Sequence, residues 1–367
     1  MKMLLVSGIY PPDVGGPASY IPKLAEAMHQ QGIRVEVLTL RNRRTENQSS
    51  TWRINYAYRE SALLIRMMKV IYTALLKLRQ SEAVFANGLH QEIAIALCFI
   101  RVRSIAKIVG DPVWERARNK GETNLTLSEF TNAIEKTVRQ KIERIFLVWS
   151  LNRYDIVICP SVELVEIVRA WGVKTKVQFI PNGVDEISPS QLGTRYDICS
   201  ASRLVKWKNI DKVIKAADSS EASLAIAGEG PELLNLTREA RSNEKPVHFL
   251  GQLSDLEVNK LLSQSRLFVL FSDYEGLSFG LLKAMSLGMP IIVSDAPGNT
   301  AVLQNRKDCL VVTRGETEEL SKAISELLTD TKLARQLGEN AKLKAVNEYS
   351  EKKLINQVIT ILKQARL

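Results

Sequence analysis

The stretch that most limits how this chain can fold is residues 273–295, DYEGLSFGLLKAMSLGMPIIVSD. A run of apolar residues at 267–271 precedes it and predicts a buried strand. The pattern then predicts a helix over residues 278–287, a turn at 288–290 and a second buried strand at 291–294. A strand, a loop, a helix and a strand in this order are typical of a parallel α/β sheet.

The start of the predicted helix has the chemistry of an anion site. The backbone N–H groups of Leu277, Ser278 and Phe279 have no partner within the helix, and the helix dipole favours a phosphate beside them. Glu275 and Gly276 come directly before them, so a hydroxyl-rich group could be held next to the anion. Every doubly wound α/β protein contains such units, however, so their shape alone leaves open whether a ligand binds here.

Composition allows two ordinary globular domains. The chain has 367 residues, of which 45% are hydrophobic and 25% charged. Its four cysteines are scattered without a CxxC spacing, which favours buried thiols over a metal site or disulfides. The apolar run at residues 2–7 is too short for a signal-peptide core, so we expect a cytoplasmic protein.

The positive charge belongs to the first half of the chain. Residues 1–185 contain 26 Lys and Arg against 17 Asp and Glu, out of a net charge of +10 for the whole chain. Such a basic half suggests nucleic acid, anionic lipid or a phosphorylated substrate. Residues 61–79 and 134–154 both predict basic amphipathic helices. The polar stripe of the first carries three charges, Arg66, Lys69 and Lys77, too many to span a bilayer, so this helix either packs on the core or lies on a membrane surface.

Four motifs, taken in order, resemble one family. They are the glycine pair Gly15-Gly16, the sequence IPNGVD at 180–185, the Arg203-Leu-x-x-x-Lys208 spacing, and Glu275-Gly276 followed by LLKAMSLGMP. This set is similar to the retaining glycosyltransferases of family four, among the glycosyl transferases group 1. The resemblance implies the GT-B fold, an α/β fold in which two Rossmann-like domains face each other across a cleft. It places acceptor binding in residues 1–185 and donor binding in residues 186–349, with a last helix at about 350–367 packing back on the first domain.

The resemblance also implies site residues. Glu275 would contact the donor sugar, and Arg203 with Lys208 would neutralise the donor diphosphate; these three are the candidate catalytic residues. The candidate donor-binding residues are Gly15, Gly16, Gly251, Gln252, Gly276, Leu277, Ser278, Phe279 and Lys283. The candidates for contact with the acceptor or the transferred sugar are Asn87, His90 and Asp111.

Four of these candidates carry open alternatives. Lys283 stands where the family has a second Glu that accepts hydrogen bonds from ribose hydroxyls, and an ammonium can only donate. It could instead act as a positive charge on the diphosphate, accommodate a donor whose ribose sits differently, or point to solvent while the ribose is held elsewhere. Asn87 stands where relatives often have His, and His90 is a nearby substitute. Asp111 comes before a proline and is equally suited to forming a turn.

The predicted function is transfer of a sugar, with retention, from a nucleotide-diphosphate sugar to a glycan or lipid-linked acceptor in cell-surface polysaccharide synthesis. The resemblance implies neither a metal nor a cofactor, and nucleic acid is not an expected partner. Docking on the inner face of a membrane is an additional expectation from the charge. A GT-B-type sugar-nucleotide epimerase and a weakly active sugar-nucleotide-binding subunit stay open, and the donor sugar, base, acceptor and oligomeric state are not determined by these motifs.

Overall fold

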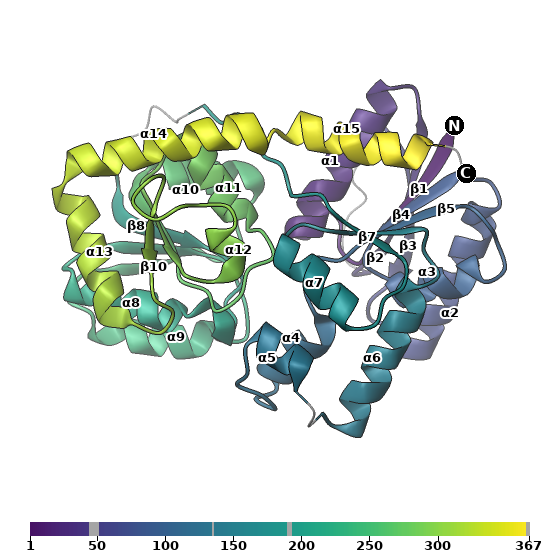
Figure 1. The fold of residues 1–367 in the computed structure, drawn as a ribbon, viewed down its shortest axis with the longest axis horizontal. Helices are drawn as coiled ribbons and strands as arrows, with labels where there is room; N and C mark the ends of the chain where they lie inside the picture. Colours follow the sequence, from purple (N-terminus) through teal and green to yellow (C-terminus); the bar gives the residue numbers. More distant parts are fainter. Residues whose placement is uncertain (44–50, 134–135, 189–192, 365–367) are drawn as a thin grey trace. The chain divides into compact units, whose positions relative to one another are not determined.

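The computed structural model describes residues 1–43, 51–133, 136–188 and 193–364. These residues form two compact units, each built on one parallel sheet (Figure 1). The first unit contains Met1–Val113, Thr131–Ile180 and Lys352–Leu367, and the second contains Trp114–Phe130 and Pro181–Glu351. The predicted α/β class with two Rossmann-like parts is confirmed. The assignment of acceptor and donor binding to residues 1–185 and 186–349 stays a prediction.

The sheet of the first unit has seven strands in the order β3-β2-β1-β4-β5-β6-β7. Its central strands are short and mostly buried, as expected for a parallel sheet covered on both faces. In β1 every residue after the first is buried. The strand order reverses between β1 and β4, which is where ligands bind in open α/β sheets. The strands are β1 (Lys2–Ser7), β2 (Arg34–Arg41), β3 (Arg53–Tyr58), β4 (Ala83–Asn87), β5 (Arg103–Lys107), β6 (Ile156–Cys159) and β7 (Lys176–Phe179).

The helices of the first unit include the last helix of the chain. The amide of Gln31 donates to Asn356 Oδ1 at 2.8 Å, and Arg103 Nη1 donates to the carbonyl of Leu362 at 2.8 Å. These contacts fasten α15 to the first unit, although residues 365–367 of the predicted C-terminal helix lie outside the described part of the chain. The helices are α1 (Gly16–Gln30), α2 (Leu63–Leu78), α3 (His90–Leu97), α6 (Val138–Leu151), α7 (Val162–Ala170) and α15 (Glu351–Lys363).

The sheet of the second unit has six strands in the order β10-β9-β8-β11-β12-β13. Its strand order reverses between β8 and β11, in the same way as in the first unit. The strands are β8 (Tyr196–Ala201), β9 (Leu224–Ala227), β10 (Val247–Phe249), β11 (Ser265–Leu270), β12 (Ile291–Ser294) and β13 (Leu310–Val312). The helices are α8 (Ile210–Ser219), α9 (Leu233–Glu239), α10 (Asp255–Ser263), α11 (Phe279–Leu287), α12 (Pro297–Thr300), α13 (Thr317–Thr329) and α14 (Thr331–Glu348), with short 3-10 helices at Lys206–Lys208 and Ala240–Ser242.

Helix α11 begins and ends where the sequence predicts. The Ser278 hydroxyl accepts a hydrogen bond from the Leu281 N–H at 3.3 Å, which satisfies one of the free donors of the first turn. Gly288 follows the helix with φ +72°, a conformation that glycine adopts without steric cost and that ends many helices. These local signals explain why α11 could be predicted from residues 278–288 alone.

One segment leaves the first unit and packs on the second. After β5 the chain enters α4 (Pro112–Asn119) and α5 (Leu127–Asn132), and Trp114–Phe130 belongs to the second unit. Trp114 is completely buried there. Its ring lies 5.1 Å from that of Trp207 and 5.6 Å from that of Tyr274, measured between centroids. Three packed aromatic rings of this size anchor the segment firmly.

Candidate functional site

The candidate catalytic residues lie together at the carboxyl ends of two paired strands of the second unit. β8 and β11 are parallel neighbours, so the loops that follow them meet at the same edge of the sheet. Arg203 comes from the loop after β8, and Lys208 ends the short 3-10 helix that follows this loop. Glu275 comes from the loop between β11 and α11.

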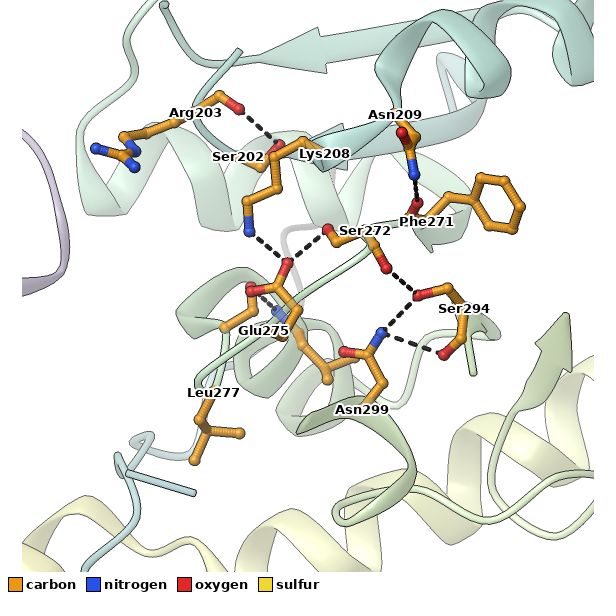
Figure 2. A network of polar contacts seen from close by, with 12 residues as sticks. Ser202, Arg203, Lys208, Asn209, Phe271, Ser272, Glu275, Leu277, Ser294 and Asn299 are labelled. Carbon is orange, nitrogen blue, oxygen red and sulfur yellow. Dashed lines mark hydrogen bonds and ion pairs between the residues drawn. The ribbon is translucent and has the colours of Figure 1, made fainter. Parts of the chain in front are cut away.

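Glu275 is held in a buried network (Figure 2). Its Oε1 accepts a hydrogen bond from the Ser272 hydroxyl at 2.6 Å and forms an ion pair with Lys208 Nζ. The Glu275 side chain is 6% exposed and the Lys208 side chain 13% exposed. Within the described chain no donor contacts Oε2, so the second carboxylate oxygen is left for another hydrogen-bond donor.

The support for this carboxylate comes from the loops behind it. The carbonyl of Ser272 accepts a hydrogen bond from the Ser294 hydroxyl at 2.5 Å, and the Asn299 amide donates to that same hydroxyl at 3.1 Å (Figure 2). A Cβ at Gly298 would lie 1.9 Å from the Glu275 carbonyl oxygen, so only glycine allows α12 to approach this closely. Ser272, Ser294 and Asn299 therefore fix Glu275 and were not identified from the sequence.

Arg203 is in a different environment from Lys208. Its side chain is 62% exposed, and Nη2 lies 2.8 Å from Glu115 Oε2, a carboxylate of the segment Trp114–Phe130. Its guanidinium also lies 5.7 Å from the centre of the Trp207 ring. The two candidate cations thus differ in access, since Lys208 is nearly buried beside Glu275 and Arg203 faces solvent.

Asp273 connects the segment Trp114–Phe130 to the loop of Glu275 through hydrogen bonds. Arg118 Nη2 donates to Asp273 Oδ2 at 2.9 Å, and the Asn209 amide donates to Asp273 Oδ1 at 2.6 Å. This contact could not be predicted from the sequence, because 155 positions separate Arg118 from Asp273. The segment Trp114–Phe130 therefore contributes one anion, Glu115, and one cation, Arg118, to the site.

The start of α11 has the geometry expected of an anion site. In the described part of the chain no acceptor contacts the backbone N–H groups of Leu277, Ser278 or Phe279. The carbonyl of Leu277 accepts a hydrogen bond from the Asn182 amide at 3.0 Å, which fixes the peptide before Ser278. Gly276 is buried beside Glu275. The N–H groups and the carboxylate are therefore carried on one short loop.

Lys283 does not extend into solvent. The residue is 8% exposed, and its Nζ lies 2.8 Å from Asp255 Oδ1 at the beginning of α10. Asp255 follows the loop of Gly251 and Gln252, where Gly251 has φ +66° and Gln252 is exposed. A positive side chain at this position thus brings a carboxylate from α10 beside the predicted nucleotide loop. Whether Lys283, Gly251 and Gln252 contact a donor stays a prediction.

The candidates of the first unit lie at the carboxyl edge of its sheet. Gly15 has φ +148° and immediately precedes α1, and Gly16 is the first residue of that helix. Asn87 ends β4 and is 4% exposed. The Asp111 carboxylate accepts a hydrogen bond from the Val113 N–H at 2.8 Å, the turn contact that was the alternative to sugar binding. It also pairs with Arg144, so this buried acid has a structural role whatever else it contacts.

His90 begins α3 with its ring against the backbone. Nε2 lies 3.1 Å from the carbonyl oxygen of Lys107 and 3.3 Å from the backbone nitrogen of Gly88. Burial lowers the pKa of His90 to about 4, so the imidazole is neutral at pH 7. A neutral imidazole fixed in this way can form a hydrogen bond but is a weak base.

Two family models match consecutive parts of the chain. Residues 14–186 match the model described as Glycosyltransferase Family 4, and residues 185–344 match the model described as Glycosyl transferases group 1. Together they cover both units, including all the candidate site residues. The chain belongs to the group 1 glycosyltransferases. The family resemblance read from the four motifs is confirmed.

Known proteins similar to this glycosyltransferase support the same family and fold. N-acetyl-alpha-D-glucosaminyl L-malate synthase of Bacillus anthracis is 26% identical over 58% of the chain, and the match spans 60% of that synthase. Matches to two other curated relatives span 47% and 43% of their lengths. Sucrose-phosphate synthase of Thermosynechococcus elongatus has a TM-score of 0.80 at 18% identity, covering 99% of this chain and 98% of that one. The Anabaena protein HepE in complex with UDP and glucose has a TM-score of 0.76 at 18% identity, covering 99% of both chains.

Among the described residues, no three or more His, Cys, Asp or Glu side chains gather as ligands for a metal ion. No helix in the described ranges combines the length and hydropathy needed to cross a bilayer.

Proposed function

We propose that this glycosyltransferase moves a sugar, with retention, from a nucleotide-diphosphate sugar to a glycan or lipid-linked acceptor in cell-surface polysaccharide synthesis. Its family supports sugar transfer. The fold it shares with HepE of Anabaena, whose structure contains UDP and glucose, supports a nucleotide-linked donor. Neither a specific sugar nor a specific base follows from the fold, because loops determine both.

The observation that carries the proposal is the buried network of Glu275, Lys208 and Ser272 beside the start of α11. The second oxygen of Glu275 can accept a hydrogen bond from a sugar hydroxyl. The N–H groups of Leu277 and Ser278, on the same loop, can bind an oxygen of the diphosphate. One rigid loop thus offers partners for both halves of a sugar diphosphate.

The proposed chemistry needs no protein nucleophile. The bond between the anomeric carbon and the diphosphate oxygen breaks, and the acceptor oxygen bonds to the same face of that carbon. The acceptor proton passes to the departing phosphate oxygen. Arg203 and Lys208 stabilise the negative charge that develops on the leaving diphosphate, a role that a metal ion has in other enzymes. We therefore propose transfer without a metal or an organic cofactor.

We further propose that the Lys283 and Asp255 pair contacts the nucleotide in place of the family's second glutamate. Lys283 holds the Asp255 carboxylate next to the Gly251 loop, and the Asp255 side chain is 44% exposed. A carboxylate in this position can accept hydrogen bonds from ribose hydroxyls, which Lys283 itself cannot. Asn87 and His90 remain the proposed contacts for the transferred sugar in the first unit.

A donor screen followed by one variant tests the function. Thermal shift with the common UDP and GDP sugars should single out a donor, since a ligand at 100 times its dissociation constant stabilises by about 2.7 kcal/mol. With that donor, Arg203→Ala should lower turnover roughly a hundred- to a thousandfold. The matched control is Arg335→Ala, which removes an arginine that is 81% exposed on α14 and should leave turnover unchanged.

The same assay separates the alternatives. Interconversion of UDP-GlcNAc without an acceptor would identify an epimerase instead. Donor binding without any transfer to glycan or lipid-linked acceptors would identify a binding subunit. Normal turnover in Arg203→Ala would remove Arg203 from the catalytic residues.

A further inference from the structure

Exposed large hydrophobic side chains concentrate on one surface of the first unit. Helices α2 and α6 both pack against the short helix α3, so the three lie side by side (Figure 1). Each leads into the next strand of the sheet in the same direction, which places all three on one face. Their outward side chains define what we call the α2–α6 surface: Leu63, Leu64, Ile65, Met68, Tyr72 and Leu76 of α2, Phe99 after α3, and Val138, Ile142, Ile145 and Phe146 of α6.

These side chains are too exposed to be the edge of a core. Leu64 is 72% exposed, Val138 74% and Phe99 76%. The helices have separate inner residues for packing, such as Val70 and Leu147, which are buried. Monomeric soluble proteins rarely expose contiguous apolar patches of this kind, and those that do mostly use them to bind something.

The charges around the α2–α6 surface have one predominant sign. α2 contains no acidic residue, and Lys69 on it is exposed. Arg101 follows α3, Lys141 lies on α6 and Arg153 follows α6, and all three are exposed. Glu143 is the single acid of α6, and Arg139 lies 3.6 Å from it. An apolar surface bordered by cations complements a surface that is apolar inside and anionic outside.

We propose that the α2–α6 surface binds the face of an anionic lipid bilayer. Its apolar side chains would enter the boundary between headgroups and acyl chains, and its lysines and arginines would meet the lipid phosphates. α2 has 16 residues and would lie flat in this boundary. A second copy of the chain fits less well, because a two-fold symmetric contact would set this basic surface against itself.

The position of the α2–α6 surface also suits a lipid-borne substrate. α2 and α6 run opposite to the strands, so their first residues lie at the carboxyl edge of the sheet, the edge that carries Asn87 and His90. That a lipid-borne substrate reaches this edge rests on the proposed function. The membrane contact rests only on the exposed apolar side chains and the cations of the α2–α6 surface.

Vesicle co-sedimentation of the full chain tests the proposal. The protein should sediment with vesicles of phosphatidylcholine and phosphatidylglycerol and not with phosphatidylcholine alone. Binding should fall steeply between roughly 0.1 M and roughly 1 M salt, where the screening length drops from about 10 to about 3 Å. The double variant L64Q/M68Q should bind about a hundredfold more weakly, since each apolar side chain withdrawn from the boundary is worth roughly a factor of ten.

The control variant is L256Q, because Leu256 is 81% exposed on α10 in the second unit, and it should bind like the parent chain. Equal binding to neutral and anionic vesicles, or undiminished binding by L64Q/M68Q, would overturn the proposal. So would a dimer in sedimentation velocity that the double variant dissociates, which would assign the surface to a second copy. The assay contains neither donor nor acceptor, so its failure would leave the transferase function standing, and lack of transfer would leave the membrane contact standing.

Discussion

Removing one partner of the nearly buried ion pair between Lys208 and Glu275 should strongly lower the stability of the second unit. Both side chains are nearly buried, at 13% and 6% exposed. Removing one partner of such a pair leaves the other charge unpaired and costs roughly 3–5 kcal/mol, whereas replacing both is often close to neutral. Lys208→Met and Glu275→Gln should therefore each destabilise the second unit by about this amount. In a unit of this size the melting temperature should fall by roughly 6 to 20 °C.

The double variant Lys208→Met with Glu275→Gln decides between a pair and two independent residues. Its melting temperature, measured by scanning calorimetry, should lie above that of either single variant, because no charge is left unpaired. The glutamine can still accept the hydrogen bond of Ser272. As a control, the exposed pair of Arg335 and Glu339 on α14 should show a coupling below roughly 0.5 kcal/mol. A coupling equally small for Lys208 and Glu275 would refute the buried pair and the argument that Glu275 is held in place by it.

Three further changes test other parts of the chain. Lys283→Glu places a second carboxylate beside that of Asp255, so it should lower stability and change donor affinity at least roughly tenfold. Adding Asp255→Lys should restore the stability. A donor affinity that calorimetry finds unchanged in Lys283→Glu would exclude a contact between Lys283 and the nucleotide. Glu115→Gln removes the exposed ion pair between Glu115 and Arg203, which is worth roughly 0.2–1 kcal/mol, so UDP should bind up to about fivefold more tightly in calorimetry. Weaker binding of UDP would show instead that Glu115 positions Arg203. Burial lowers the pKa of His90 to about 4, so the unfolded state binds the proton more readily than the folded state. The free energy of unfolding should therefore fall by at most about 3 kcal/mol as pH drops from 6.5 to 4. His90→Asn should flatten this part of the pH profile, measured by urea unfolding, and an unchanged profile would contradict the lowered pKa of His90.

Local signals explain what could be predicted from the sequence. The apolar runs, the capping serine at 278 and the glycine at 288 each act on neighbouring residues, and they predicted α11 to within one residue. The two parallel sheets follow from such units in succession. The motif spacing singled out Arg203, Lys208 and Glu275, and the structure places them at one sheet edge because the segments after β8 and β11 meet there. Their catalytic role stays a prediction.

Contacts between distant residues explain what could not be predicted. Lys283 stood out as a departure from the family, but nothing near it in sequence indicated Asp255, which is 28 positions away. Asp111 had two interpretations, and Arg144, the partner of this buried carboxylate, lies 33 positions further on. Side chains that meet only in the folded chain leave no periodic pattern. The same is true of Trp114, whose aromatic partners lie in the other half of the sequence.

The main chain passes between the two units at four places: 113/114, 130/131, 180/181 and 351/352. Consider a hybrid enzyme in which two relatives are joined near residue 180. It would combine the Trp114–Phe130 segment of one parent with Trp207 and Tyr274 of the other, the two rings on which Trp114 packs. Such hybrids should fold poorly unless the segment is exchanged with the second half. Exchange of the whole second unit, in the laboratory or in evolution, would require two separate pieces of the gene to be transferred together.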